Sequence, residues 1–214
     1  MKVLIACEES QRTCLEFRKL GHEAFSCDIQ PCSGENPKWH IQGDAIKEAY
    51  SGKYDLMVAH PPCTYLSNAG SRWLFENGKL NNTRYNQGLQ AKAFFMKLYN
   101  APIKYKAIEN PTPIKIFKMP KHSQTIQPYE YGEPYSKRTL LWLVNLPLLQ
   151  PTKILREYEP YLPSNTGLGR RLGRKFKFVS INKVDSSKTF IGISQAMAKQ
   201  WSEPKNYLLQ HKLF

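Results

Sequence analysis

Short runs of apolar residues, separated by polar stretches, recur through the first two thirds of the chain. The runs are continuous rather than strictly alternating, which is typical of strands buried on both faces of a parallel sheet. In chain order they cover residues 2–8, 23–29, 41–46 (the weakest), 54–60 and 105–111. A longer run at 138–146, RTLLWLVNL, predicts a further strand rich in Leu and Trp.

Apolar residues at helical spacing predict three helices between and after these runs. The first is capped by Ser10 and ended by Gly21, and it turns these side chains inward: Cys14, Leu15, Phe17 and Leu20. The second covers 82–99 and offers four side chains for burial, Leu89, Phe94, Phe95 and Leu98. The third begins near Ser194 and stops before Pro204.

Strand and helix patterns therefore alternate along the chain. This repetition predicts an α/β fold with a mostly parallel sheet and helices on both faces, which is a Rossmann-like architecture. We expect one domain over residues 1–214, with a small basic insert at about 150–189.

Polar groups follow several of the predicted strands at the point where each strand ends. They are Glu8, Asp28, Cys63 and Glu109. Ligands bind open α/β sheets at the carboxyl ends of the strands, where these four side chains would meet. Each of them alone could be an ordinary surface or core residue, but their convergence predicts a functional site.

The cofactor side of this site is indicated by two acids. The segment ACEESQ at 6–11 lacks the G-x-G-x-x-G pattern of a dinucleotide binder. Asp28, twenty residues after Glu8, can accept hydrogen bonds from ribose hydroxyls, and Asp44 can accept from an adenine amino group. Ribose and adenine contacts without a phosphate cradle favour S-adenosylmethionine over NAD or ATP, although each acid could also be an exposed turn residue.

The chemical side of the site is indicated by two rigid strand exits. Pro61 and Pro62 fix the backbone just before Cys63, and Glu109 is followed by Asn110 and a further proline. A thiolate is a strong nucleophile, and a nearby carboxylic acid can donate a proton. The alternative for Cys63 is a buried structural thiol, which is the commoner situation.

At these residues the sequence resembles the DNA cytosine-5 methyltransferases. The resemblance implies that Cys63, in Pro-Pro-Cys, attacks carbon 6 of a cytosine, and that Glu109, in Glu-Asn-Pro, bonds at nitrogen 3. Carbon 5 would then take a methyl group from S-adenosylmethionine. The resemblance is greatest to short, phage-type members, and it implies a methyltransferase version of the Rossmann-like fold.

The same resemblance covers most of the chain in the family's usual order. LIACEES, SCDI, GDAI and the segment FIGISQAMAKQW at 190–201 resemble its cofactor-binding segments. The cofactor contacts that this implies are Ala6, Cys7, Glu8, Asp28, Ile29, Asp44, Ala45, His60, Pro61 and Gly192. YGEPYSKRTLLWL resembles the segment whose basic residues face the flipped base, and here Lys137 and Arg138 are both candidates.

A polyanionic partner is expected from the charge. The chain has 31 Lys and Arg against 17 Asp and Glu, giving a net charge of +14. We expect DNA, double- or single-stranded, to contact Ser67 and Asn68 after the Pro-Pro-Cys motif and basic residues of the insert, namely Arg170, Arg171, Arg174 and Lys175. A short insert predicts low or short-site sequence specificity. The basic run could instead be a solvated loop.

Several other classes are disfavoured by the sequence. The five cysteines form no CxxC pair and match no zinc pattern, so we expect neither a disulfide framework nor a metal site. No stretch is apolar enough to span a bilayer, and the start of the chain has no signal-peptide shape, which predicts a cytoplasmic protein, in a bacterial or phage-infected cell if the resemblance holds. The sequence gives no sign of the oligomeric state, and a monomer is the default expectation. The open alternatives are an exocyclic amino methyltransferase, a non-catalytic nucleic-acid-binding module, and an enzyme acting on RNA, a free nucleotide or with another transferred group.

Overall fold

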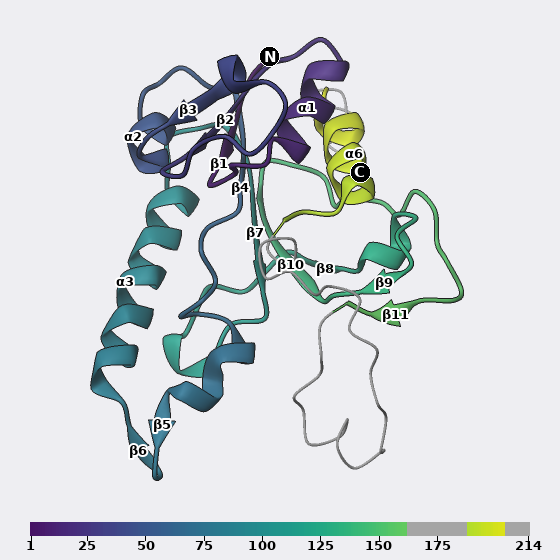
Figure 1. Cartoon of the computed structure of the whole chain (residues 1–214). Helices are drawn as coiled ribbons and strands as arrows, with labels where there is room; N and C mark the ends of the chain where they lie inside the picture. The colour runs from purple at the N-terminus through teal and green to yellow at the C-terminus, as the bar shows by residue number, and fades with distance from the viewer. Residues whose placement is uncertain (162–187, 204–214) are drawn as a thin grey trace, which may run out of the picture.

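A seven-stranded sheet forms the centre of the protein, in the order β3-β2-β1-β4-β7-β10-β8 (Figure 1). The computed structural model describes residues 1–161 and 188–203. The strands of this sheet are β1 (Lys2–Ala6), β2 (Glu23–Asp28), β3 (His40–Gln42), β4 (Leu56–Ala59), β7 (Tyr105–Pro111), β8 (Gln124–Ile126) and β10 (Thr139–Val144). Five of the six strands predicted from the sequence are confirmed. The weakest, predicted at 41–46, is a strand only to Gln42, because Asp44 caps the helix that begins at Ala45. β8 is an additional strand, too short to give an apolar run.

The sheet is parallel except at one strand. β3, β2, β1, β4 and β7 pair in parallel with one another, whereas β10 is antiparallel to both β7 and β8. The chain order reverses between β1 and β4, because β2 and β3 lie on one side of β1 and the later strands on the other. In open α/β sheets this switch point is where a crevice forms at the carboxyl ends of the strands.

Helices cover both faces of the sheet, as predicted. On one face α1 (Arg12–Lys19) packs against α6 (Ile191–Trp201), and Phe17 and Trp201 are buried in that core. On the other face lie α2 (Ala45–Ala49) and α3 (Asn82–Tyr99), and Phe95 is buried beside the sheet. Successive residues of a strand point to opposite faces, so Val3 and Leu4 enter different cores.

Three details of the predicted helices are wrong. The residue before α1 is Gln11, at φ 60°, and Ser10 makes no cap; the backbone N–H groups of Thr13 and Cys14 instead bond to the carboxylate of Glu8, at 2.7 and 3.2 Å. Leu20 is 50% exposed because it follows the last turn of α1, and Leu89 is 41% exposed. On α3 the buried stripe is formed by Gly88, Phe95 and Leu98, and Leu89 lies off it.

A segment called here the arm, residues 64–80, leaves the sheet after β4 and lies at one end of α3 (Figure 1). It contains the 3-10 helix η2 (Asn68–Trp73) and a hairpin of β5 (Phe75–Glu76) and β6 (Lys79–Leu80). The other short elements are η1 (Pro37–Trp39), η3 (Lys115–Phe117), η4 (Pro128–Glu130), β9 (Tyr135–Ser136) and β11 (Glu159–Pro160). Most of the predicted basic insert, residues 162–187, lies outside the described residues.

Candidate functional site

The carboxyl ends of four parallel strands are aligned at one edge of the sheet. Ala6 of β1 is paired with Cys27 of β2 and with Ala59 of β4, and Ala59 is in turn paired with Ile108 of β7. The residues that follow these four are therefore at the same level: Cys7, Asp28, His60 and Glu109. Glu109 differs slightly from its predicted place, because β7 continues to Pro111 through its pairing with β10.

His60 and Glu109 form a largely buried pair at the centre of this edge, with 9% and 17% of their side-chain surfaces exposed. His60 Nδ1 lies 3.1 Å from Glu109 Oε2 and 3.3 Å from Thr189 Oγ1. Burial disfavours charge on both groups, but their hydrogen bond and mutual attraction outweigh it. The pKa of His60 is therefore raised and the pKa of Glu109 is lowered, which favours an imidazolium–carboxylate pair.

Cys63 lies in a backbone loop that is held at both ends. Before it, the side-chain N–H of Asn110 donates to the carbonyl oxygen of Pro61 at 2.8 Å. After it, the N–H groups of Leu66 and Ser67 donate to the carbonyl oxygen of Cys63, at 3.0 and 2.8 Å. The thiol is half-buried, and burial together with the charge of Glu109 raises the pKa of Cys63, against an opposing effect of a nearby lysine.

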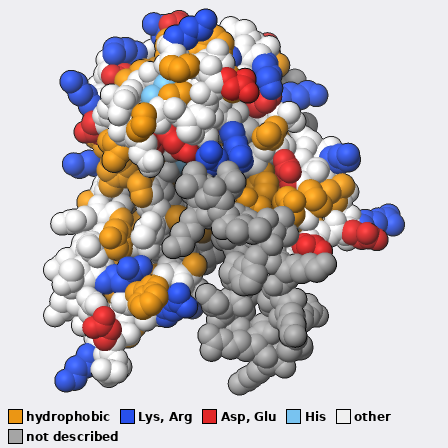
Figure 2. Space-filling view, viewed as in Figure 1, with side chains coloured by type: hydrophobic (Ala, Val, Ile, Leu, Met, Phe, Trp, Pro, Cys, Tyr) orange, Lys and Arg blue, Asp and Glu red, His pale blue; other side chains and the backbone are white. Residues whose placement is uncertain are grey.

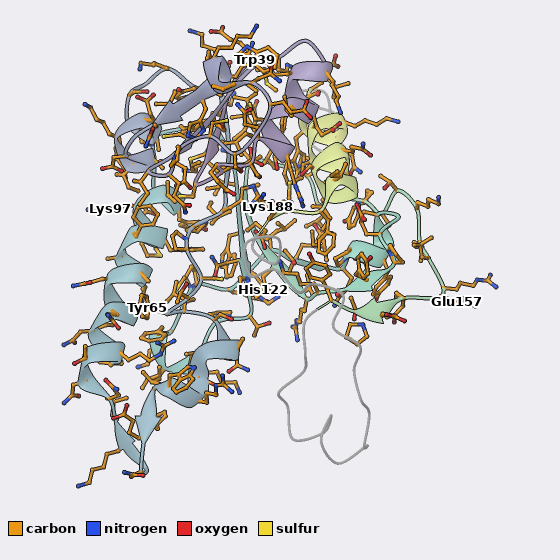
Figure 3. All side chains as sticks on the ribbon, in the orientation of Figure 1. Trp39, Tyr65, Lys97, His122, Glu157 and Lys188 are labelled. Atoms are coloured by element: carbon orange, nitrogen blue, oxygen red, sulfur yellow. The ribbon has the colours of Figure 1, made fainter. Side chains whose placement is uncertain are left out.

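That lysine is Lys137, and the structure distinguishes it from Arg138. Lys137 is half-buried and lines a small pocket with Glu109, Thr139 and Thr189, whereas Arg138 is exposed. The two residues immediately precede β10, where consecutive side chains alternate in direction. Lys188 lines the same pocket and is labelled in Figure 3 near the middle of the molecule.

A second pocket, of about 210 Å³, lies beside the ends of β1 and β2. Five of the predicted cofactor residues line it: Cys7, Asp28, Ile29, Asp44 and Ala45. Asp28 Oδ1 accepts from the N–H of Gln30, and Asp44 Oδ1 accepts from the N–H of Ile46 and so caps α2. The remaining wall is formed by Gln30, Gly43, Pro62 and Phe94, and none of these was among the predicted contacts.

The other predicted cofactor residues do not line this pocket. Ala6 and Pro61 are buried in the sheet edge, and His60 is paired with Glu109. Glu8 is buried at the start of α1, where burial raises its pKa against the two backbone hydrogen bonds and the charge of His60. Gly192 lies in α6 and packs closely against the backbone of Tyr131, so a side chain at position 192 would collide with the Tyr131 carbonyl oxygen.

Cys7 has an unusual backbone conformation for its position. Its φ is 60°, in the left-handed region that favours glycine, and its N–H donates to the carbonyl oxygen of Cys27 at 2.7 Å. Strained residues of this kind cluster at ligand-binding sites. Burial raises the pKa of the Cys7 thiol, and Asp28 and Asp44 add to the effect, so Cys7 contributes an uncharged wall to the pocket.

Of the predicted nucleic-acid contacts, Asn68 is exposed and Ser67 is buried, where its hydroxyl accepts from the N–H of Ala69. The four insert residues, Arg170, Arg171, Arg174 and Lys175, lie outside the described residues.

The arm carries an exposed aromatic surface that was not predicted from the sequence: Trp73 is 55% and Phe75 is 50% exposed. The guanidinium of Arg72 lies 4.7 Å from the Trp73 ring centre.

Figure 2 shows this arm at the lower left, where a hydrophobic side chain lies between Lys or Arg side chains. Tyr65 of the arm lies beside α3 in Figure 3, with the guanidinium of Arg84 5.1 Å from its ring centre. The missed signal was the segment SRWLFENGK, which places two aromatic residues among charged ones and ends in an Asn-Gly turn. The arm starts directly after Cys63 in the chain.

Comparison of the chain with protein-family models gives no match, and neither does comparison with curated proteins. Among residues 1–161 and 188–203, no three His, Cys, Asp or Glu side chains are grouped as metal ligands. The helices of this described part are too short or too polar to cross a membrane.

Proposed function

We propose that the protein is an S-adenosylmethionine-dependent methyltransferase that modifies carbon 5 of cytosine in DNA, with Cys63 as nucleophile and Glu109 as acid. The observation that carries this proposal is the position of Pro62. Pro62 lines the same pocket as Asp28 and Asp44. Cys63 is the next residue in the chain. A cofactor held by the two acids and a base held at Cys63 would be adjacent.

The pocket suits the nucleoside part of the cofactor. Each acid uses only Oδ1 in a hydrogen bond to the described residues, which leaves Oδ2 of Asp28 and of Asp44 to accept from hydroxyl or amino groups. Ile29 and Phe94 offer apolar surface to a flat ring. A volume of about 210 Å³ is below the roughly 300–1,000 Å³ of typical ligand pockets, so part of the cofactor would lie outside it. When bound, S-adenosylmethionine would supply the methyl group.

The proposed chemistry uses three side chains of the site. Cys63 Sγ, as the thiolate, forms a bond to carbon 6 of the base while Glu109 donates a proton to nitrogen 3. The cationic Lys137 favours the thiolate, since its charge lowers the pKa of Cys63. After carbon 5 is methylated, a water molecule takes the proton from carbon 5 and the Sγ–C6 bond breaks. Cys63 is released as a thiolate, and nitrogen 3 returns its proton to Glu109.

DNA as the substrate is supported by charge and by the arm. The net charge of +14 favours a polyanion. A base must leave its stack to reach an enzyme's nucleophile, and exposed aromatic residues with arginine neighbours stabilise unstacked bases. Trp73, Phe75 and Arg72 form such a surface on the segment that begins after Cys63.

The test is covalent trapping on an oligonucleotide that contains 5-fluorocytosine. Fluorine cannot leave as a cation, so after methyl transfer the Sγ–C6 bond should persist. We expect an adduct that requires S-adenosylmethionine and maps to Cys63 by peptide mass spectrometry. Cys63→Ser should abolish it, and Cys32→Ser, at a half-buried cysteine in the β2–β3 connection, should not.

Two outcomes would contradict the proposal. Methyl incorporation that survives Cys63→Ser, at an exocyclic amino group of the product, would indicate an amino methyltransferase instead. A folded protein that neither binds S-adenosylmethionine by calorimetry nor forms the adduct would indicate a nucleic-acid-binding module.

A further inference from the structure

The imidazole of His60 is held on one side and unpartnered on the other. Nδ1 faces Glu109 Oε2 at 3.1 Å and Thr189 Oγ1 at 3.3 Å. Nε2 is buried and has no hydrogen-bond partner among the described residues. A buried polar atom without a partner is uncommon in folded proteins, and it is often found where a group has a catalytic task.

We propose that His60 is a positioning residue for Glu109: it orients the carboxyl group through Nδ1–H and, by gaining or losing a proton at Nε2, decides when Glu109 carries the proton that a cytosine needs. This inference rests on the proposed function. Glu109 Oε2 is occupied by His60, whereas Oε1 makes no hydrogen bond to the described residues, so Oε1 is the oxygen left to face the base.

The tautomer of His60 follows from this geometry. A carboxylate oxygen can only accept, so Nδ1 must carry a hydrogen for the 3.1 Å contact to be a hydrogen bond. Nδ1–H is therefore present in both charge states of the ring, and titration takes place at Nε2. The hydrogen bond that orients Glu109 survives titration, and only the charge beside Glu109 changes.

The pair then shares one proton in two arrangements. In one arrangement Nε2 carries it and Glu109 is ionised, and in the other Oε1 carries it and His60 is neutral. Only the second arrangement can protonate nitrogen 3: the Oε1–H bond breaks, the N3–H bond forms and Glu109 becomes a carboxylate. When the adduct collapses, nitrogen 3 returns the proton to Oε1.

Other charged groups around His60 act on the same equilibrium. Glu8, at the start of α1, favours the imidazolium, and Lys137 disfavours it. Lys188 lines the small pocket beside Glu109, and the thiol of Cys63 responds to both Glu109 and Lys137. The pair is therefore the central member of a coupled group, and its titration is best followed as a macroscopic property.

A first experiment measures the coupling without catalysis. His60 is titrated by NMR on ¹⁵N-histidine-labelled protein, with His60→Asn identifying its signal among the five histidines. In Glu109→Gln the carboxylate is removed, so the His60 midpoint should move to lower pH than in the wild type. An unchanged midpoint in a folded Glu109→Gln protein would overturn the inference.

A second experiment measures the pH dependence of 5-fluorocytosine adduct formation. In His60→Asn the amide nitrogen can replace Nδ1–H but does not titrate. In the wild type, either His60 or Glu109 can hold the shared proton, so the pair keeps this proton to a higher pH than Glu109 alone would. In His60→Asn only Glu109 can hold it. The loss of rate at high pH should therefore begin at a lower pH in His60→Asn than in the wild type. His60→Gln, whose amide nitrogen lies nearer the Nε2 position, should be slower than His60→Asn.

The control is His22→Asn, at the opposite edge of the sheet, where the ring contacts Ser202. Its profile should match the wild type. A His60→Asn profile that superimposes on the wild type, or a His60→Gln rate equal to that of His60→Asn, would overturn the inference even if the methyltransferase activity is real. If no variant or wild-type protein forms an adduct but the NMR midpoints differ, the proposed function fails and the pairing stands.

Discussion

Asn110 donates a hydrogen bond from its side-chain nitrogen to the carbonyl oxygen of Pro61, over 2.8 Å and away from solvent. It links the exit of β7 to the exit of β4, so the Glu109 segment and the Cys63 segment are held to each other. Pro61 and Pro62 lack N–H groups, and two further strand-like hydrogen bonds cannot form there. The side-chain N–H of Asn110 instead satisfies the carbonyl oxygen of Pro61 and joins the two strand exits.

Removing this bond should affect both stability and reactivity. In Asn110→Ala the Pro61 carbonyl remains buried without its partner, and we expect the free energy of unfolding to fall by about 1–3 kcal/mol. The Cys63 loop should also lose its alignment, which lowers the rate of adduct formation by up to about 100-fold. Urea unfolding and 5-fluorocytosine trapping measure the two effects.

The matched control is Asn86→Ala, at an exposed position of α3. It should change neither quantity appreciably. If Asn110→Ala lost stability but trapped the base at the wild-type rate, the bond would be structural only.

Asp28 provides a test of the cofactor pocket. Because hydrogen bonds to a charged group are worth about 1.5–3 kcal/mol, Asp28→Ala should weaken binding of S-adenosylmethionine by about 10-fold or more. Isothermal titration calorimetry measures the dissociation constant. Asp55→Ala is the control: Asp55 accepts from the N–H of Lys2 at the opposite end of the strands, and its loss should leave the constant unchanged. Equal constants for both variants would exclude Asp28 from the cofactor site.

The pH at which Cys63 becomes reactive should depend on the charges of Glu109 and Lys137. Burial and Glu109 raise the pKa of Cys63, and Lys137 lowers it. Lys137→Met should therefore shift alkylation of Cys63 to higher pH, and Glu109→Gln should shift it to lower pH. At neutral pH we expect Lys137→Met to react about 3- to 10-fold more slowly, because a smaller fraction of Cys63 is then present as the thiolate.

Peptide mass spectrometry after iodoacetamide treatment reports on Cys63 separately from the other cysteines. Arg138→Met, at the exposed neighbouring position, should react as the wild type does. A shift with Arg138→Met and none with Lys137→Met would reverse the assignment of the two basic residues.

Trp73 offers a test of DNA binding by the arm. Stacking of one base on an aromatic side chain contributes about 1–3 kcal/mol, so Trp73→Ala should weaken binding of a single-stranded oligonucleotide by at least about 5-fold. Fluorescence anisotropy at fixed salt measures the affinity. Leu20→Ala, at an exposed apolar residue after α1, is the control and should bind as the wild type does. An unchanged affinity for Trp73→Ala would exclude the arm from the interface.

Much of this architecture was predictable because strand burial leaves a direct trace in the sequence. The continuous apolar runs predicted β1, β2, β4 and β7, and helical spacing predicted α3 over the same residues, 82–99, that the structure gives. Strand ends in a parallel sheet meet at one edge, so Asp28, Asp44 and Cys7 could be expected near one another. Their shared pocket follows from that rule.

Local spacing could not predict the roles of individual polar side chains. Glu8 and His60 were expected at the cofactor, and the structure shows Glu8 bonded to the start of α1 and His60 bonded to Glu109. The contacts of Glu8 and of His60 depend on which side chains and backbone groups the fold brings within hydrogen-bonding distance. Nothing in a run such as VAHPPC indicates which neighbouring strand will supply a partner.

The sequence by itself determined the sheet, the helices on its two faces and the edge where the polar residues gather, because hydrophobic periodicity and strand-end chemistry are local properties of the chain. Only the tertiary structure decided that His60, Glu109 and Thr189 meet, that Lys137 faces inward beside them while Arg138 is exposed, and that Asn110 holds Pro61. These contacts join residues up to 129 positions apart. They depend on strand order and register, which arise from packing the whole sheet rather than from any one segment.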